Sequence, residues 1–168
     1  STYFRSLLTT NKKYRYEQEI KISFVTTIYA YLTEYVTFPH VNLPDVCDTD
    51  NIEDIEIKLR ECWNLGYGPI DNLIFYAEKN GIILTSVETS TNDIDAFSQK
   101  IYINDEERYI VALSKNKSTA ARLHFDVAHE LGHIMLHDWE DDIENISPSE
   151  FRDREQQAND FASAFLLP

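Results

Sequence analysis

The sequence predicts an α+β fold, in which a small, mainly antiparallel sheet packs against a helix. Up to residue 80, apolar side chains recur at helical spacing and the runs are interrupted by Pro and Gly. Between residues 81 and 113 the pattern becomes extended, and from residue 119 it is helical again. With 168 residues and 43% hydrophobic content, the chain is long enough for one ordinary globular core. We therefore expect helices before and after a central sheet.

Three helices are expected before the sheet. Residues 14–37 predict a long helix with one apolar side, ended by Pro39 and Pro44. A second helix is expected at 52–64, with Asp50 or Asn51 as its cap, and a third opens at Pro69 and stops at Asn80-Gly81. The apolar side of the long helix consists of Phe24, Ile28, Tyr31, Leu32 and Tyr35.

Short β-rich runs separated by polar turns predict the sheet. They lie at residues 81–87, 96–97, 100–103 and 109–113, and residues 104–107 suit a hairpin turn. We expect the run 109–113 to be an exposed strand edge, which could hold a peptide in extended form by main-chain hydrogen bonds.

The predicted helix after the sheet contains His129-Glu130-Leu131-Gly132-His133, which is the pattern H-E-x-x-H. Positions four apart lie on one helix face, so His129 and His133 can bind one metal ion. Glu130 then lies beside the metal-bound water as a general base and is not itself a ligand. Ser118 or Thr119 can cap this helix, and Gly132 inside it predicts close approach of another backbone.

A catalytic zinc site needs a third protein ligand. His137 continues the spacing, but eight residues of helix rise about 12 Å, too far to share an ion with His129. It is better placed as a partner at the helix C-terminus. The acidic candidate is Glu155, on a second helix that Ser147, Pro148 and Glu150 begin with a capping box.

Glu155 is the charged member of an otherwise apolar helix face, and a buried carboxylate requires a partner. The sequence thus predicts a metal site of His129, His133 and Glu155. This ligand set suits one zinc ion, and Mn²⁺ or Fe²⁺ would also accept it. Asn159, one turn further on, either supports a metal ligand by a hydrogen bond or makes hydrogen bonds near the core that have no link to the site. The rest of the face is Phe151, Ala158, Ala162 and Phe165.

Two runs of the chain together resemble the ImmA/IrrE family of zinc metallopeptidases. One runs from Arg122 to His133, and the other is Glu155-x-x-Ala158-Asn159-x-Phe161-Ala162, ending in Phe165-Leu166-Leu167-Pro168. The resemblance implies a zincin-like, gluzincin-type endopeptidase. It also implies a protein substrate, namely a DNA-binding transcriptional repressor of a mobile element or stress response.

The resemblance extends upstream to members in which an Xre-type helix-turn-helix domain precedes the peptidase domain. It is carried by residues 3–6, 59–70, 95–98 and Gly81. It implies an attached helix-turn-helix domain in a longer protein, of which this chain is a piece. We expect residues 1–44 to form a helical extension or linker and residues 45–168 to form the ImmA/IrrE-like metallopeptidase domain.

The charge of the chain limits its partners. A formal net charge of -14 repels phosphate backbones, so we expect no direct nucleic-acid binding. Eight acidic residues between positions 138 and 155 form either a solvated loop or a surface that selects a basic substrate. Cys47 and Cys62 predict no disulfide framework or cysteine metal site. Without a signal peptide or a long apolar run, a soluble, cytoplasmic protein is expected, with no membrane contact.

Two other classes of function remain open beside the peptidase. In one, the metal site is structural or sensory, and the domain controls an attached DNA-binding module without cutting a protein. Asp126 or an acid after His137 would then be the fourth ligand of a closed site. In the other, the chain is an interaction module with an empty site. Intact Glu130 favours the enzyme, because a structural site needs no general base. For the oxyanion, Arg122, His124 and a tyrosine are all candidates.

Overall fold

The computed structural model describes residues 12–88, 96–114, 119–137, 139 and 146–167, with side chains from residue 16 onward. Ser118, Asp95, residues 3–6 and the acidic loop residues before Glu150 lie outside the described residues, as do the basic side chains before residue 16. The described chain is α+β, with five helices and a three-stranded mixed sheet. The elements are α1 (Lys12–Leu32), α2 (Ile52–Trp63), α3 (Leu73–Lys79), β1 (Ile82–Val87), β2 (Ala96–Ile103), β3 (Glu106–Ser114), α4 (Ala120–Leu136) and α5 (Pro148–Leu166).

The sheet has the strand order β1-β3-β2. β2 and β3 form the expected antiparallel hairpin, turning at Asn104 and Asp105, which both adopt positive φ. β1 pairs with β3 in parallel, so the expectation of a mainly antiparallel sheet is wrong: one of the two pairings is parallel. Residues 96–103 form one strand rather than two, because Ser98 and Gln99 interrupt the apolar pattern without ending the strand.

β3 is the central strand, so the expectation that residues 109–113 form an exposed edge is also wrong. Its run from Arg108 to Ser114 is buried throughout. A continuous apolar run is typical of a strand covered on both faces, whereas an edge strand more often alternates. The edges in the described sheet are β1 and β2.

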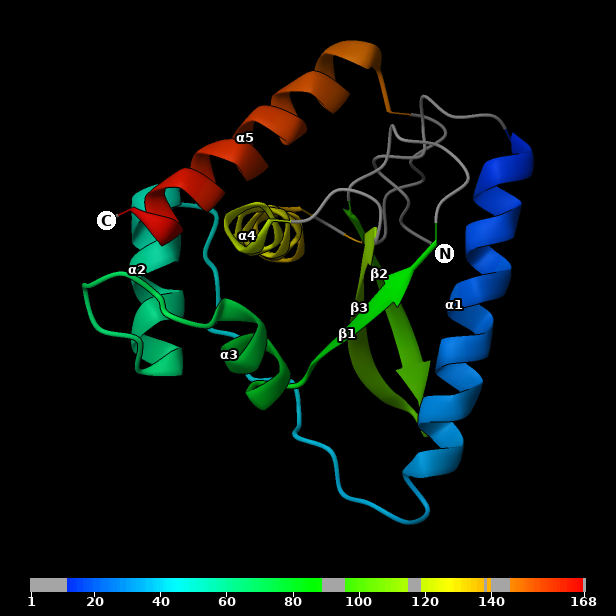
Figure 1. Ribbon diagram of the computed structural model, residues 1–168. Helices are drawn as coiled ribbons and strands as arrows, with labels where there is room; N and C mark the ends of the chain where they lie inside the picture. Colours follow the sequence, from blue (N-terminus) through cyan, green and yellow to red (C-terminus); the bar gives the residue numbers. More distant parts are fainter. Residues whose placement is uncertain (1–11, 89–95, 115–118, 138, 140–145, 168) are drawn as a thin grey trace.

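Helices cover both faces of the sheet (Figure 1). α4 lies on one face, where Val127, Ala128 and Leu131 pack against Tyr109 and Val111. α1 lies on the opposite face, where Ile22 packs among the strand residues that point the other way, such as Phe97 and Ile110. The alternation of side chains along each strand separates these two clusters. α2, α3 and α5 pack around the α4 side of the molecule.

α1 differs from expectation in its end and its packed side. Helical bonding ends at Leu32 and gives way to turns up to Val36. The predicted apolar side exists, but its members are exposed to solvent, and Ile22, Val25 and Tyr29 form the packed side instead. Helical spacing alone could not decide between them, because both sides of α1 carry large apolar residues. None of the helices in the described residues is long and apolar enough to span a bilayer.

α2 and α3 bring the first part of the chain onto the core. Of the two predicted caps, Asp50 and Asn51, it is Asn51 that caps α2, and it forms a full capping box with Asp54. α3 begins after Asn72 rather than at Pro69, because the Asn72 side chain accepts the hydrogen bond that starts the helix. At Gly81 (φ +86°) a Cβ atom would lie 2.4 Å from the backbone oxygen of His40, so only glycine fits between α3 and β1.

Candidate metal centre

Local capping signals place the two helices that build the site. The Thr119 side chain accepts a hydrogen bond from the amide of Arg122 and begins α4. Ser147 does the same for Glu150 and begins α5, with Pro148 in the first turn as predicted. The Glu150 carboxylate forms an ion pair with Arg154, 2.6 Å away.

α4 and α5 cross at Gly132. A Cβ atom there would lie 3.1 Å from the Cα atom of Ala158 and 3.1 Å from the ring of Phe161. The predicted approach of another backbone is confirmed. This crossing brings α5 close enough to α4 for Glu155 to face the two histidines.

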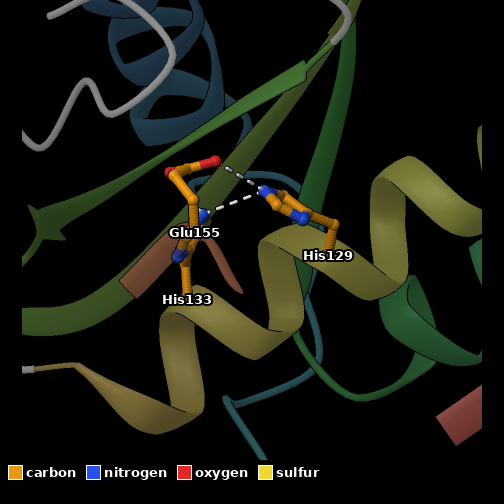
Figure 2. Close-up of side chains that lie close together, drawn as sticks. All are labelled: His129, His133 and Glu155. Atoms are coloured by element: carbon orange, nitrogen blue, oxygen red, sulfur yellow. Dashed lines mark hydrogen bonds and ion pairs between the residues drawn. The ribbon is translucent and has the colours of Figure 1, made fainter. Parts of the chain in front are cut away.

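His129, His133 and Glu155 converge on one point (Figure 2). The Nε2 atoms of the two histidines are 3.0 Å apart. Glu155 Oε2 lies 3.4 Å from His129 Nε2, and Glu155 Oε1 lies 3.2 Å from His133 Nε2. Among the described residues, this is the group of side chains with the spacing to hold a metal ion.

The three separations fit a metal ion. A tetrahedral ion with bonds of about 2.0–2.1 Å separates its ligand atoms by about 3.3 Å, and the donor atoms here are 3.0, 3.2 and 3.4 Å apart. Glu155 Oε1 is also buried and receives no well-oriented hydrogen bond. A buried carboxylate oxygen of this kind calls for a cation. The residues present therefore fit a bound metal.

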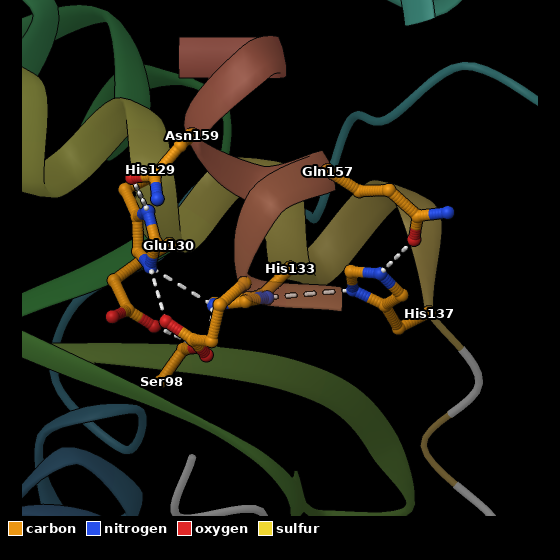
Figure 3. A network of polar contacts seen from close by, with 8 residues as sticks. Ser98, His129, Glu130, His133, His137, Gln157 and Asn159 are labelled. Atoms are coloured by element: carbon orange, nitrogen blue, oxygen red, sulfur yellow. Dashed lines mark hydrogen bonds and ion pairs between the residues drawn. The ribbon is translucent and has the colours of Figure 1, made fainter. Parts of the chain in front are cut away.

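The outer nitrogens of both rings have partners that leave Nε2 available to a metal (Figure 3). His129 Nδ1 lies 3.0 Å from Asn159 Oδ1, which can only accept, so the ring nitrogen donates. His133 Nδ1 lies 3.4 Å from His137 Nδ1, and His137 Nε2 lies 2.9 Å from Gln157 Oε1. If His137 donates to Gln157, its Nδ1 accepts from His133. Both ligand rings then present an unprotonated Nε2.

The charges at the site favour a cation. Burial lowers the pKa of His129, but the hydrogen bond with Glu155 and the charges of Glu130 and Glu155 outweigh burial and raise that pKa. Burial alone would raise the pKa of Glu155, yet the close approach and the charges of His129 and His133 keep that pKa far below its ordinary value. A proton on Nε2 and a metal ion therefore compete for the same position.

Glu130 is buried next to this cluster and contacts the sheet. Ser98 Oγ donates a hydrogen bond of 2.5 Å to Glu130 Oε2. Ser98 is itself buried, because it lies on the same face of β2 as Ala96, the face that α4 covers. The carboxylate that follows His129 is thus fixed by a residue more than 30 positions upstream in the chain.

The model of one protein family, the IrrE N-terminal-like domain (Peptidase M78), matches residues 77–168, more than half of the chain. The chain belongs to this family. Membership supports a metallopeptidase-type function with a protein as substrate. The matched part of this Peptidase M78 chain runs from the end of α3 through the sheet to the end of α5, so it contains the whole cluster. Comparisons with curated proteins and with solved structures gave no match.

The structure brings together most of the residues predicted from the sequence of this Peptidase M78 chain. His129, His133 and Glu155 meet, Glu130 lies beside them, and Asn159 supports His129. His137 lies at the C-terminal end of α4, as expected, and contacts the outer nitrogen of His133. Ser98 and Gln157 were not predicted to take part, because only the fold places them near the histidines.

The other candidate residues are not part of the cluster of His129, His133 and Glu155. Asp126, proposed as a fourth ligand, pairs with Arg122 at 3.8 Å and is not part of the metal-capable group. The alternative acids of the loop after His137 lie outside the described residues. The choice among Arg122, His124 and a tyrosine as oxyanion stabiliser stays a prediction.

Proposed function

We propose that this chain is a zinc-dependent endopeptidase with a zincin-like core of the gluzincin type. The single observation that carries the proposal is the cluster of His129, His133 and Glu155 at tetrahedral spacing, with buried Glu130 next in sequence to the first ligand. Family membership supports the same class of reaction. In this proposal residues 45–168 form the peptidase domain and residues 1–44 an extension.

The proposed ligands are His129 Nε2, His133 Nε2 and one carboxylate oxygen of Glu155. When bound, a zinc ion supplies Lewis acidity that activates water near neutral pH and polarises a peptide carbonyl. Two imidazoles and one carboxylate suit zinc, and Mn²⁺ or Fe²⁺ would accept the same set. Three protein ligands leave a position for water, as a catalytic site requires.

The protein's own residues then carry the proton. The Glu130 carboxylate accepts a proton from the water while the water oxygen attacks the scissile carbonyl carbon. Glu130 later delivers that proton to the leaving amine nitrogen. Ser98 orients this carboxylate through its bond to Oε2. Asn159 and the pair of His137 and Gln157 fix the ring orientations of the two ligand histidines.

β2 is the edge on which we propose that an extended peptide binds. Within the described sheet, β2 pairs with β3 on one side, and it carries Ser98, which contacts Glu130. A peptide held in extended form beside β2 by main-chain hydrogen bonds would lie near Glu130, which Ser98 contacts. Residues 109–113 do not suit this role, since β3 is paired on both sides.

The proposed substrate is a DNA-binding repressor, as the family resemblance implies. The net charge of -14 supports this choice, because a negatively charged protein attracts the basic surface of a DNA-binding protein and repels DNA itself. The proposed attached helix-turn-helix domain would place such a substrate close by. We also propose a cytoplasmic location, because a DNA-binding repressor would be met there.

Metal content is the first test. Elemental analysis of protein purified without added metal should give about one zinc per chain for the wild type and for Glu130→Gln, which keeps all three ligands. Glu155→Ala should retain little metal. Full zinc in Glu155→Ala would show that another group is the third ligand, and no metal in any variant would remove the basis of the proposal.

Cleavage is the second test. The wild type and Glu130→Gln should each be co-expressed with helix-turn-helix repressors from the same genome, and cleaved fragments identified by mass spectrometry. We expect at least one repressor to be cut by the wild type and not by Glu130→Gln. Cleavage by zinc-loaded Glu130→Gln would contradict the mechanism, and bound zinc without cleavage of any repressor would support the regulatory alternative.

A further inference from the structure

The outward side of α1 carries a continuous apolar strip. Phe24 is 66% exposed, Ile28 58% and Tyr31 58%, although all three are large apolar residues. Their neighbours on the same side are also exposed. We define the α1 strip as Tyr16, Ile20, Phe24, Ile28, Tyr31 and Tyr35.

The opposite side of α1 is already used. Ile22 is fully buried against the sheet, and Val25, Tyr29 and Ala30 pack beside it. A helix of a soluble domain normally turns its large apolar residues toward the core and polar residues toward solvent. α1 lies at the margin of the molecule with one side toward the sheet (Figure 1), so the α1 strip is the side that needs a cover.

An apolar groove continues the strip toward the sheet edge. It has a volume of about 710 Å³ and lies between α1, Phe38, Phe75 and the outer side of β1. Ile28 belongs both to this groove and to the α1 strip. The apolar surface is therefore wider than one row of side chains, and contiguous surfaces of this size on soluble proteins usually mark interaction sites.

The charge of the strip indicates its partner. The middle of the strip, residues 22–33, contains no Asp, Glu, Lys, Arg or His, whereas Glu17, Glu19, Lys21 and Glu34 lie toward its two ends. Two copies that each carry a net charge of -14 repel one another, so the uncharged middle of the strip is where they can approach with the least repulsion. A strongly charged partner would find no complementary charge here. These observations favour a second copy of the same chain.

The spacing of the strip fits an antiparallel pair of helices. With a two-fold axis near residue 26, position 16 faces 35, position 20 faces 31, and position 24 faces 28, so every apolar residue of the strip meets another. Glu17 then faces Glu34 at each end of the interface, where Lys21 pairs with Glu17 at 2.7 Å. With aromatic rings of roughly 150–250 Å² each, the exposed parts of the strip amount to roughly 600 Å² per copy. Two copies would bury roughly 1,200 Å², the lower limit for a specific interface.

We propose that the chain forms a two-fold symmetric dimer through antiparallel packing of its α1 strips. This interface lies on the face of the sheet opposite α4 and does not depend on the proposed peptidase function. Phe24 and Ile28 lie next to the axis, so each contributes twice to the interface. The exposed Tyr31 and Tyr35 hydroxyls lie 3.2 Å apart and can hydrogen-bond to each other.

Sedimentation velocity on the full chain tests the dimer. At about 50 μM the wild type should sediment as a dimer, and Phe24→Glu and Ile28→Glu should each weaken the dimer by about tenfold or more, because a charge would be buried twice. Tyr67→Glu, which changes a 74% exposed residue away from α1, is the matched control and should remain dimeric. Circular dichroism and metal content should not change in any of them, because the altered side chains are exposed.

A cross-linking experiment tests the direction of the helices. In a variant with Cys47 and Cys62 replaced by Ser, Thr27→Cys lies next to the two-fold axis and should be joined to its copy by a short bismaleimide. Glu19→Cys should not be joined, since antiparallel packing puts the two copies of residue 19 at opposite ends. A wild type that is monomeric at every concentration, a dimer that survives Phe24→Glu, or efficient linkage through residue 19 would overturn the proposal.

Discussion

Ser98 Oγ lies 2.5 Å from Glu130 Oε2, and both side chains are buried between β2 and α4. The bond joins the edge strand of the sheet to the helix that carries both histidines. It fixes one carboxylate oxygen beside the metal centre, in the place where the proposed reaction needs a proton acceptor. Substitution of Ser98 should therefore affect the chemical step more than the binding of metal or peptide.

Ser98→Ala should lower kcat by about ten- to a hundredfold, with little change in KM or zinc content. Ser98→Thr retains the hydroxyl and should recover most of the loss, which a purely structural role would not explain. The measurement is steady-state cleavage of the identified substrate, together with elemental analysis. If Ser98→Ala were fully active, the bond would have no role in positioning Glu130.

Asn159 accepts a hydrogen bond from His129, so its removal should act on the metal. Asn159→Ala should weaken zinc affinity by about ten- to a hundredfold, because His129 loses the partner that fixes its tautomer and ring orientation. Gln157→Ala is the matched control: Gln157 reaches His133 only through His137, so its effect should be smaller. Affinity is measured by competition with a fluorescent chelator. Equal losses in the two variants would argue against a specific role for Asn159.

Metal binding should depend on pH through His129. The pKa of this residue is raised, because the hydrogen bond with Glu155 and nearby negative charges outweigh burial. The proton on His129 stabilises the metal-free form at low pH and is lost as the pH rises through the raised pKa. Zinc affinity should therefore begin to fall at a higher pH than for an ordinary histidine, whose pKa is about 6.5.

Chelator competition between about pH 5 and pH 8 measures this dependence. In Glu155→Gln the charge that favours the protonated histidine is removed, so the fall should move to lower pH, although the overall affinity is reduced. An unchanged midpoint in Glu155→Gln would show that Glu155 does not control the protonation of His129.

Local signals in the sequence predicted the grouping of His129, His133 and Glu155 better than they predicted the sheet. Helical spacing puts His129 and His133 on one face without knowledge of the fold, and a lone carboxylate on an apolar face identifies Glu155. Capping residues such as Thr119 and Ser147 set where both helices begin. These features depend on neighbours within a few residues, which the sequence displays directly.

Features that depend on contacts between distant segments were not predictable in this way. The parallel pairing of β1 with β3 places β3 in the centre, although hairpin signals describe only consecutive strands. The contact of Ser98 with Glu130 follows from that arrangement. The packed side of α1 was equally undetermined, because apolar residues occur on both sides and only the position of the sheet distinguishes them.

Gly132 lies where α4 meets the backbone of α5, and its substitution should disturb the metal site. Alanine would gain about 1 kcal/mol in helix propensity, but its Cβ would lie 3.1 Å from Ala158 Cα, one turn from Glu155. α5 must shift by a few tenths of an ångström to accept it. We expect Gly132→Ala to lose zinc affinity while its thermal stability changes little.

Gly68→Ala is the control for this substitution, because nothing lies within 4 Å of the added atom and φ is not positive there. It should leave zinc affinity at the wild-type value. Unchanged affinity in Gly132→Ala as well would mean that the crossing of α4 and α5 adapts without moving Glu155.

Arg60 is 1% exposed and connects α2 to the end of α5. Its Nη2 donates to the backbone oxygen of Phe165 at 2.5 Å, its Nη1 donates to those of Gly66 and Gly68, and its Nε lies 3.2 Å from Glu56. Burial raises the pKa of Glu56, an effect that the charge of Arg60 opposes. Arg60→Met would leave this carboxylate and three carbonyl oxygens without their partner.

Arg60→Met should therefore lower the free energy of unfolding by about 3–5 kcal/mol, as expected when one member of a buried ion pair is removed. Urea unfolding monitored by circular dichroism measures the change. The double variant Glu56→Leu, Arg60→Met removes the unpaired charge and should regain part of the loss, because apolar replacement of a whole buried pair is often tolerated. A single variant as stable as the wild type would show that Arg60 does not stabilise the junction of α2 and α5.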